Sequence, residues 1–410
     1  MIGNKNLETR NERVRKAVPL ETPDRVPFVP TLGNVYCLEY GVTIKSAMQD
    51  NANLIPALDA LLRECDPDLL YTPDFFPLRT METLGAVNMS WPGKKPEFGD
   101  NFTYQINDAT YLDDEDYEEF LKDPSAFLAG KVLTQKFSAL KGLKYLDFYS
   151  LCGSTVMGFA GLGNPLLRES LEKLLEAGRI TSEFTKGMMQ VESYCLEKGY
   201  PVWGNAVMQN PFDSFADNIR GLINTVMDLK TDPDLLSEAV NRMADAVIPK
   251  DVAAAKMMHA QYAFIPLHTG VDEFMSPDDY NRYYWPPLRR LIDSLLKEDI
   301  TPMIFCEGNY YTRLETLKDV PKGQVVYFFE KQDMKKAKEI LGDTACIAGN
   351  LDTGLLMHGT PEAVTEETKR LLDICAPGGG YIMSNSISLD NCKRENLIAW
   401  RQTVSDCGKY

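Results

Sequence analysis

Residues 301–310 read TPMIFCEGNY, an apolar run that ends in a carboxylate, a glycine and an asparagine. Short β-branched or aromatic runs of this kind recur along the whole chain, and longer helical patterns separate them. This alternation of strand and helix is typical of parallel βα units. The strand-like runs are Val26–Leu32, Asp68–Thr72, Tyr145–Leu151, Val202–Met208, Ala263–Leu267, Thr301–Cys306, Val325–Phe329, Ala345–Ile347 and Tyr381–Met383. The helical stretches include Pro165–Lys198, Pro233–His259, Pro277–Glu298, Met334–Leu341, Pro361–Cys375 and Arg394–Cys407.

The number and spacing of these runs indicate a barrel. After residue 260 the strand-like runs recur about every 20 to 40 residues. We therefore predict one domain with an α/β fold, a (β/α)8 TIM barrel with an N-terminal elaboration. Residues 1–145 would hold the elaboration and the first barrel units, and residues 146–410 the remainder of the barrel. Residues 85–111, which prolines and glycines interrupt, are predicted to be either a loop over the barrel or an N-terminal subdomain.

Three hydroxyl or carboxylate residues that precede a proline predict where helices begin. Asp232, Ser276 and Thr360 are each followed by Pro, which suits the first position of a helix, while the preceding side chain can cap it. Gly342 follows the helical stretch 334–341 and is predicted to end it.

The charge and the cysteine content indicate which classes of binding partner and which cellular compartment the sequence favours. The 410 residues include 43 Lys and Arg against 59 Asp and Glu, a formal net charge of −16. Such a chain repels nucleic-acid phosphates and anionic membranes, so neither is expected as a partner. The polar start predicts no secretory signal, and no apolar run is long enough for a membrane span. Nine single cysteines without a CxxC pair favour a cytoplasmic protein with reduced thiols. A homo-oligomer is left open.

Functional residues of a (β/α)8 barrel lie at the C-terminal ends of its strands. His268 ends one apolar run, with Asp272 close behind it, and Glu307 ends the next run. Side chains alternate along a strand, so Phe305 and Glu307 share one face while Cys306 is expected in the core against the helices. A carboxylate at a buried strand end is costly unless it is paired, protonated or bound to a metal. His268, Glu307 and Asp272 are therefore the candidate catalytic residues. Other polar residues near strand ends are Tyr310, Arg313, Glu330, Asp333, Asn350, Ser384 and Ser386.

Structural roles compete with functional ones at several of these positions. His268 could merely anchor a loop through Asp272, and Asp333 could be only a helix cap. His259 and His358 are expected to serve surface or packing roles, and Gly378–Gly380 an αβ turn. The sequence has no nucleophile-elbow serine, HExxH, Walker or dinucleotide motif, which leaves metal-assisted or carboxylate-assisted chemistry.

Several short stretches together resemble one family. They are Pro23-Asp24-Arg25-Val26-Pro27, Asp217-Asn-Ile-Arg220-Gly221, Ser276-Pro277, Glu307-Gly308, Gly349-Asn350, Gly359-Thr360-Pro361-Glu362-Ala363-Val364, Gly379-Gly380-Tyr381-Ile382 and Glu395-Asn396-Leu397. In this order they resemble the uroporphyrinogen decarboxylase superfamily, a TIM-barrel family that also contains corrinoid-dependent methyltransferases. The resemblance covers roughly residues 200–410 well and the N-terminal third thinly.

Two departures from the family pattern favour the methyltransferase-like branch. The decarboxylases follow their PDRxP start with an Arg-rich segment that holds the carboxylates of the tetrapyrrole, whereas residues 28–40 here contain no Arg. The methyltransferases that act on thiols carry His-x-Cys-Gly on the later strand, which here reads Phe305-Cys306-Glu307-Gly308. The usual zinc ligands are thus replaced, and the later ligand Cys is replaced around Ser384 to Ser386.

The resemblance implies a methyltransferase that moves a methyl group between a small methylated substrate or acceptor and a corrinoid on a separate carrier protein. Zinc is the candidate metal, with His268, Glu307 and Glu330 as its ligands. Without a metal, Glu307 would protonate a leaving alkoxide with help from His268. Tyr310, Arg313 and Asn350 would line the substrate pocket. A uroporphyrinogen decarboxylase-like lyase and a non-catalytic accessory barrel are the alternatives.

Overall fold

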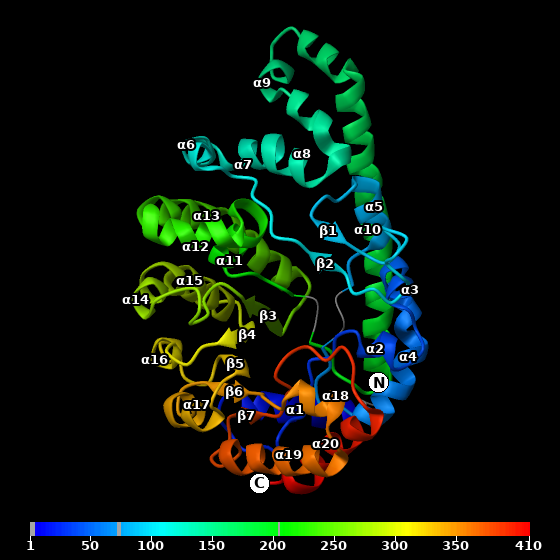
Figure 1. The fold of residues 1–410 in the computed structure, drawn as a ribbon, viewed down its shortest axis with the longest axis vertical. Coiled ribbons are helices and arrows are strands. Elements are labelled where there is room, and N and C mark those ends of the chain that lie inside the picture. The colour runs from blue at the N-terminus through cyan, green and yellow to red at the C-terminus, as the bar shows by residue number, and fades with distance from the viewer. Residues whose placement is uncertain (1–4, 72–74, 204–205) are drawn as a thin grey trace.

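Five parallel strands form the regular part of the central sheet (Figure 1). The computed structural model describes residues 5–71, 75–203 and 206–410. The strands lie side by side in chain order, and each is followed by helical structure, as βα units require. They are β3 (Tyr262–Leu267), β4 (Thr301–Asn309), β5 (Val326–Lys331), β6 (Cys346–Ala348) and β7 (Tyr381–Ile382).

Three extended segments that precede β3 in the chain close this sheet into a barrel. Phe28 forms a parallel bridge with Met383 beside β7, and the carbonyl of Phe28 accepts a 2.8 Å hydrogen bond from the backbone N–H of Asp68. Leu70 then bridges to Val202, and Val207 bridges to Phe264 of β3. The circuit of eight extended segments returns to β3, so the predicted (β/α)8 barrel is confirmed.

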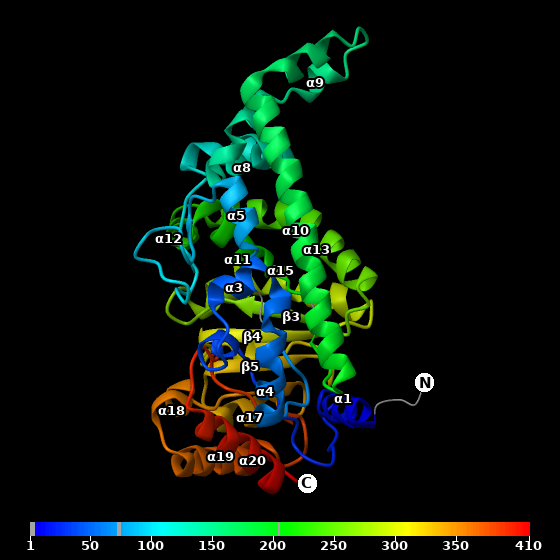
Figure 2. The same cartoon turned by 90° about the vertical axis from the view of Figure 1, so that its right-hand side faces the viewer.

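Helices lie around the barrel and across one of its ends (Figures 1 and 2). Those before the arm are α1 (Lys5–Ala17), α2 (Val35–Leu38), α3 (Ile44–Gln49), α4 (Ile55–Cys65) and α5 (Leu78–Leu84). Those after it are α11 (Pro211–Phe215), α12 (Leu222–Thr231), α13 (Pro233–Met257), α14 (Pro277–Asp279), α15 (Trp285–Leu296), α16 (Leu314–Leu317), α17 (Met334–Leu341), α18 (Thr353–His358), α19 (Pro361–Cys375) and α20 (Arg394–Cys407). None of the helices in the described residues has the length and hydrophobicity that crossing a bilayer requires.

The predicted helix caps are present. The side chains of Asp232, Ser276 and Thr360 each accept a hydrogen bond from a backbone N–H in the first turn of α13, α14 and α19. Asp333 caps α17 in the same way, and Gly342 follows the last residue of that helix. The structural alternative for Asp333, a helix cap, is thus the one that is observed.

Alternation along the strands separates two cores. Phe305 and Phe328 belong to the core inside the barrel, together with Val14 and Ala17 of α1, which therefore closes one end of the barrel. Cys306 and the other strand residues that point away from the barrel interior pack with the surrounding helices in the larger core. The predicted orientation of β4 is confirmed, because Phe305 faces inward and Cys306 faces the helices.

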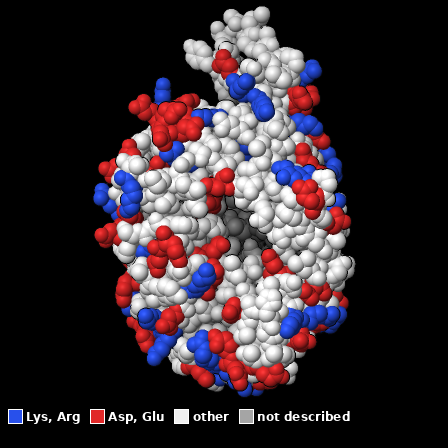
Figure 3. Space-filling view, in the orientation of Figure 1, with Lys and Arg blue, Asp and Glu red and all other residues white. Residues whose placement is uncertain are grey.

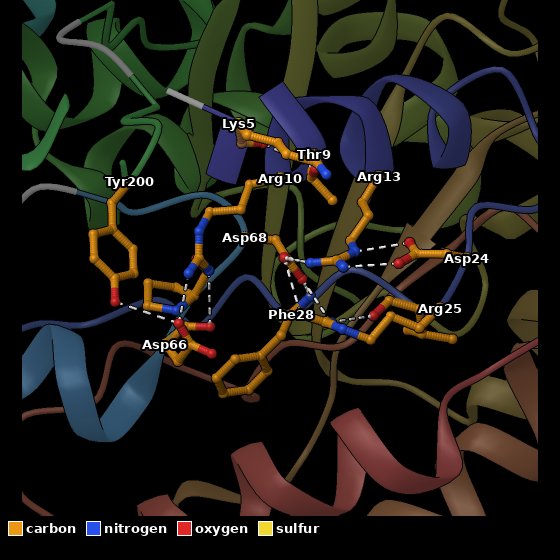
Figure 4. Close-up of polar contacts among 12 residues, drawn as sticks. Lys5, Thr9, Arg10, Arg13, Asp24, Arg25, Phe28, Asp66, Asp68 and Tyr200 are labelled. Atoms are coloured by element: carbon orange, nitrogen blue, oxygen red, sulfur yellow. Dashed lines mark hydrogen bonds and ion pairs between the residues drawn. The ribbon is translucent and has the colours of Figure 1, made fainter. Parts of the chain in front are cut away.

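A buried carboxylate explains the PDRVP motif near the start of the chain (Figure 4). The side chain of Asp68 is 0% exposed and receives hydrogen bonds of 2.6 and 3.0 Å from the guanidinium of Arg25. Arg13 of α1 donates a further bond of 2.8 Å, and the backbone N–H of Phe28 another of 2.8 Å. Asp68 therefore ties α1 and the first two barrel segments together. Asp24 pairs with Arg13 at the outer edge of this network.

An arm projects from the barrel between the second and third barrel segments (Figure 2). It contains α6 (Tyr117–Lys122), α7 (Pro124–Phe127), α8 (Leu133–Lys136), α9 (Phe148–Leu151) and the long α10 (Pro165–Glu197). The hairpin of β1 (Met89–Ser90) and β2 (Gln105–Ile106) lies nearer the barrel. Tyr145–Leu151 is at the tip of the arm and includes helix α9, so the prediction of a strand there is wrong. No strand is available there as a pairing partner among the described residues, and Asp147 caps the helix instead.

Candidate active site

The predicted pair His268 and Glu307 meets at the C-terminal end of the barrel. Leu267 of β3 is paired with Cys306 of β4, so the next residue on each strand lies side by side. The imidazole Nδ1 of His268 is 2.8 Å from Oε2 of Glu307, a hydrogen-bonding distance. Both side chains remain partly accessible, 35% exposed for His268 and 41% for Glu307. The register of two neighbouring strands thus builds a carboxylate–imidazole pair that solvent or a ligand can reach.

Two aspartates from α11 and the turn after it complete this site. Asp217 Oδ2 lies 3.8 Å from the other imidazole nitrogen, Nε2 of His268, and accepts a 3.0 Å hydrogen bond from the side chain of Gln209. Asp213 is fully buried and accepts from the backbone N–H groups of His268 and Thr269, at 3.3 and 2.9 Å. Asp217 therefore faces the imidazole, whereas Asp213 fixes the strand end that carries it.

The surrounding carboxylates control the charge of the imidazole. Burial lowers the pKa of His268, but the hydrogen bond to Glu307 and the charges of Asp213 and Asp217 outweigh it and raise that pKa to about 9. Burial, together with the neighbouring carboxylates, raises the pKa of Asp217 to about 6, although His268 opposes this shift. At neutral pH the site therefore holds an imidazolium between carboxylates.

The face of the molecule shown in Figure 3 carries more acidic than basic atoms near its centre. The space-filling view shows a hollow in the centre of this face, and red carboxylate atoms border it. A dense ring of basic residues, as a ligand with many carboxylates would need, is not seen around the hollow on this face.

Two of the three predicted zinc ligands, His268 and Glu307, are in contact, but Glu330 does not join them as a third metal ligand among the described residues. Glu330 is 13% exposed and accepts a 2.6 Å hydrogen bond from the backbone N–H of Gly308, so its carboxylate supports the end of β4. Within the described residues, no group of three or more His, Cys, Asp or Glu side chains could hold a metal ion. The donor set therefore does not fit zinc as predicted, and we assign no step to a metal.

Three other predicted site residues have structural roles. Arg313 is 1% exposed, and its guanidinium donates to the backbone carbonyls of Gly270 and Met275 at 3.2 and 2.7 Å. Asp272 lies 3.4 Å from that guanidinium and accepts a 2.7 Å bond from Thr312. Tyr310 is fully buried. Arg313 and Tyr310 are buried and hold the loop after β3 and the core beneath it, so the prediction that they line an open pocket is wrong. A catalytic role for Asp272 stays a prediction.

The remaining strand-end residues form their hydrogen bonds with groups other than His268 and Glu307. Asn350 donates from its side-chain nitrogen to the carbonyls of Glu330 and Gln332, at 3.2 and 3.0 Å. Ser384 is fully buried, and Ser386 accepts from the backbone N–H of Thr353 at 3.2 Å. A substrate contact for Asn350 stays a prediction.

Sequence reasoning missed Asp213 and Asp217. Asp217 belongs to the stretch Asp217-Asn-Ile-Arg220-Gly221, which resembles the family but received no role. Asn210-Pro211 marks a helix start just after the third barrel segment, since the Asn210 side chain caps α11. A helix that begins directly after a barrel strand places its first residues at the mouth, and this signal was available.

Comparisons with known proteins agree with this architecture. The family model described as "Uroporphyrinogen decarboxylase (URO-D)" matches residues 170–397. A uroporphyrinogen decarboxylase of Geobacter metallireducens is 33% identical over 110 residues, 27% of this chain and 32% of the relative. One from Citrifermentans bemidjiense is 37% identical over 110 residues, 27% of this chain and 31% of the relative. The chain thus matches about a third of the length of these curated relatives.

A solved structure extends the likeness over the whole chain. The "methyltransferase from Methanosarcina mazei" matches with a TM-score of 0.63 and covers 97% of this chain and 98% of its own. The sequence identity is 16%, so this likeness shows the fold alone.

Proposed function

Because the chain belongs to the uroporphyrinogen decarboxylase (URO-D) family, whose model matches more than half of it, we propose that it is the methyltransferase component of a corrinoid system. It would move a methyl group between a small methylated substrate or acceptor and a corrinoid on a separate carrier protein. The observation that carries the proposal is the imidazole of His268, placed between Glu307 and Asp217 at the open end of the barrel, where the carboxylates raise its pKa to about 9.

This arrangement supplies a proton where a leaving group needs one. When a methyl ether loses its methyl group, the bond from oxygen to carbon breaks and its electron pair stays on the oxygen. The imidazolium of His268 gives its proton to that oxygen, so a neutral alcohol leaves. A reduced corrinoid would supply the electron pair that forms the new bond to the methyl carbon. Glu307 orients the imidazole and stabilises its charge, as the carboxylate does in other carboxylate–histidine pairs.

Decarboxylation of a uroporphyrinogen is the second candidate, because the curated relatives carry that name. Two features disfavour it. The segment 28–40 has no Arg, and most of its apolar residues are buried in the core. Arg25 is buried against Asp68 rather than open to a ligand.

The test is a comparison of both activities in the purified full-length chain. We expect methyl transfer to a reduced corrinoid protein and no turnover of uroporphyrinogen. Metal analysis of the same preparation would show whether zinc is bound after all. Turnover of uroporphyrinogen without methyl transfer would contradict the proposal.

The rate of methyl transfer is expected to fall as the pH rises through about 9. Below that pH the imidazole of His268 is protonated and can donate, and above it the proton is lost. Asp217→Asn removes one carboxylate that raises the pKa of His268, so the rate of methyl transfer should decrease at a lower pH in this variant. NMR titration checks this directly, because the chain has only 3 His and the His268→Gln variant identifies the resonance. A His268 that titrates near pH 6.5 in the intact protein would contradict the mechanism.

A further inference from the structure

A second cavity opens at the same end of the barrel, on strands other than β3 and β4. Its volume is about 250 Å³. Its walls come from the ends of the first and second barrel segments, from the loop between β1 and β2, and from the residues after β7. The lining residues are Leu32, Gly33, Asn34, Tyr71, Phe75, Thr103, Tyr104, Ser388 and Asp390. We call this cavity the aromatic pocket.

The aromatic pocket combines flat apolar walls with one acidic corner. Tyr71, Phe75 and Tyr104 supply three rings, and none of the lining residues is Lys, Arg or His. Asp390 is held in place because its Oδ1 accepts a 2.9 Å hydrogen bond from the backbone N–H of Asn34. Rings of this kind favour an aromatic guest, and a carboxylate with no cation among the described lining residues repels an anionic one.

Gly33 allows the acidic corner to approach the backbone. A Cβ at this position would lie 2.4 Å from Oδ1 of Asp390 and 2.5 Å from Oγ of Ser388. Only the absence of a side chain leaves room for these two polar groups. The corner is thus a closely packed polar feature rather than a loose surface loop.

One wall of the aromatic pocket contacts the strand that leads to the candidate active site. The ring of Tyr71 lies 5.2 Å from that of Phe264, centroid to centroid. Phe264 belongs to β3, which ends one residue before His268. A ring in the aromatic pocket would therefore share the barrel mouth with the proton donor.

Most of the aromatic pocket lies outside the part of the chain that the family model matches. All three rings and Thr103 precede residue 170, where that match begins. The specificity of this chain would then come from its own N-terminal part. The placement of Thr103 and Tyr104 also supports the prediction that residues 85–111 form a loop over the barrel.

We propose that the aromatic pocket binds the ring of a neutral methoxylated phenol and discriminates against methoxybenzoates. The ring would lie among Tyr71, Phe75 and Tyr104, and a phenolic hydroxyl would donate to Asp390. A benzoate in the same place would bring its carboxylate towards Asp390 without a cation to compensate. That such a ligand is also demethylated rests on the proposed function; its binding does not.

Calorimetric titration of the full-length protein with guaiacol and with a methoxybenzoate tests this binding, and it needs no corrinoid. We expect guaiacol to bind about tenfold or more tightly than the methoxybenzoate. Asp390→Asn should bring the two affinities within about threefold, because Asn still accepts from Asn34 but carries no charge. Asp373→Asn, an exposed position on α19, is the matched control and should change neither affinity.

The rings are tested at Tyr104. Tyr104→Leu should weaken guaiacol binding about tenfold, whereas Tyr104→Phe keeps the ring and should retain most of the affinity. The inference is overturned if guaiacol does not bind, if the methoxybenzoate binds as tightly, or if Tyr104→Leu has no effect. Guaiacol binding without any methyl transfer would refute the proposed function alone. Methyl transfer from another donor, without guaiacol binding, would refute the aromatic pocket alone.

Discussion

Glu307→Gln is expected to lower the rate of methyl transfer by about 100-fold or more while the fold is retained. Gln keeps the volume and can still accept from Nδ1 of His268, but it removes the negative charge that stabilises the imidazolium. The pKa of His268 then falls towards its ordinary value, and its Nε2 carries no proton to donate at neutral pH. Because the Glu307 side chain is 41% exposed, its charge contributes little to folding. The rate should be measured beside a thermal unfolding curve.

Glu330→Gln is the variant that separates the imidazole pair from the predicted zinc site. The amide oxygen of Gln can still accept from the N–H of Gly308, so the end of β4 should remain supported. If a zinc ion joined His268, Glu307 and Glu330, this variant would lose as much activity as Glu307→Gln. We expect the rate of Glu330→Gln to fall less than about tenfold, because the proposed general acid catalysis uses only the pair of His268 and Glu307. Near-normal turnover by Glu307→Gln would refute the catalytic role of this strand end.

Asp68→Asn is expected to lower the free energy of unfolding by about 3 kcal/mol or more. The side chain of Asp68 is 0% exposed and is bonded to both Arg25 and Arg13. Removing its charge leaves the guanidinium of Arg25, 10% exposed, buried without its partner. Urea unfolding of the two proteins, followed by circular dichroism, measures the difference.

Asp24→Asn provides the matched control, since Asp24 also pairs with Arg13. Its side chain is 59% exposed, so water replaces most of what the pair contributes. The expected loss is below about 1 kcal/mol. Equal losses in the two variants would mean that burial of Asp68 does not govern the strength of this network.

The fold could be predicted from the sequence because the barrel depends on a repeating local pattern. Described residues from eight of the nine strand-like runs pair in the barrel, including Phe28 and Leu70, whose pairing is too short for regular strands. The exception, Tyr145–Leu151, has the composition of a strand but lies at the end of a projecting arm, where Tyr149 is 92% exposed. Composition alone does not show whether a partner strand is within reach.

The candidate site could be predicted only as far as the strands themselves extend. Parallel pairing of β3 and β4 places His268 beside Glu307, and that follows from register. Beyond the strand ends the direction of a side chain depends on loop packing, so Arg313 and Tyr310 were assigned to a pocket although they are buried. The role of Asp217 is harder to predict, because its position beside the imidazole depends on hydrogen bonds, such as that from Gln209, that form only in the folded protein.

The closure of the barrel has a consequence for how the chain folds during synthesis. The bond from the backbone N–H of Thr31 to the side chain of Asn385 spans 354 residues, and the parallel bridge of Phe28 is formed with Met383, beside β7. Contacts of such sequence separation form late, since the intervening chain must first be ordered. A nascent chain that lacks its last 30 or so residues would hold an open sheet with an unpaired edge at the first barrel segment. We expect chains released before β7 to aggregate rather than to accumulate as a folded shorter barrel.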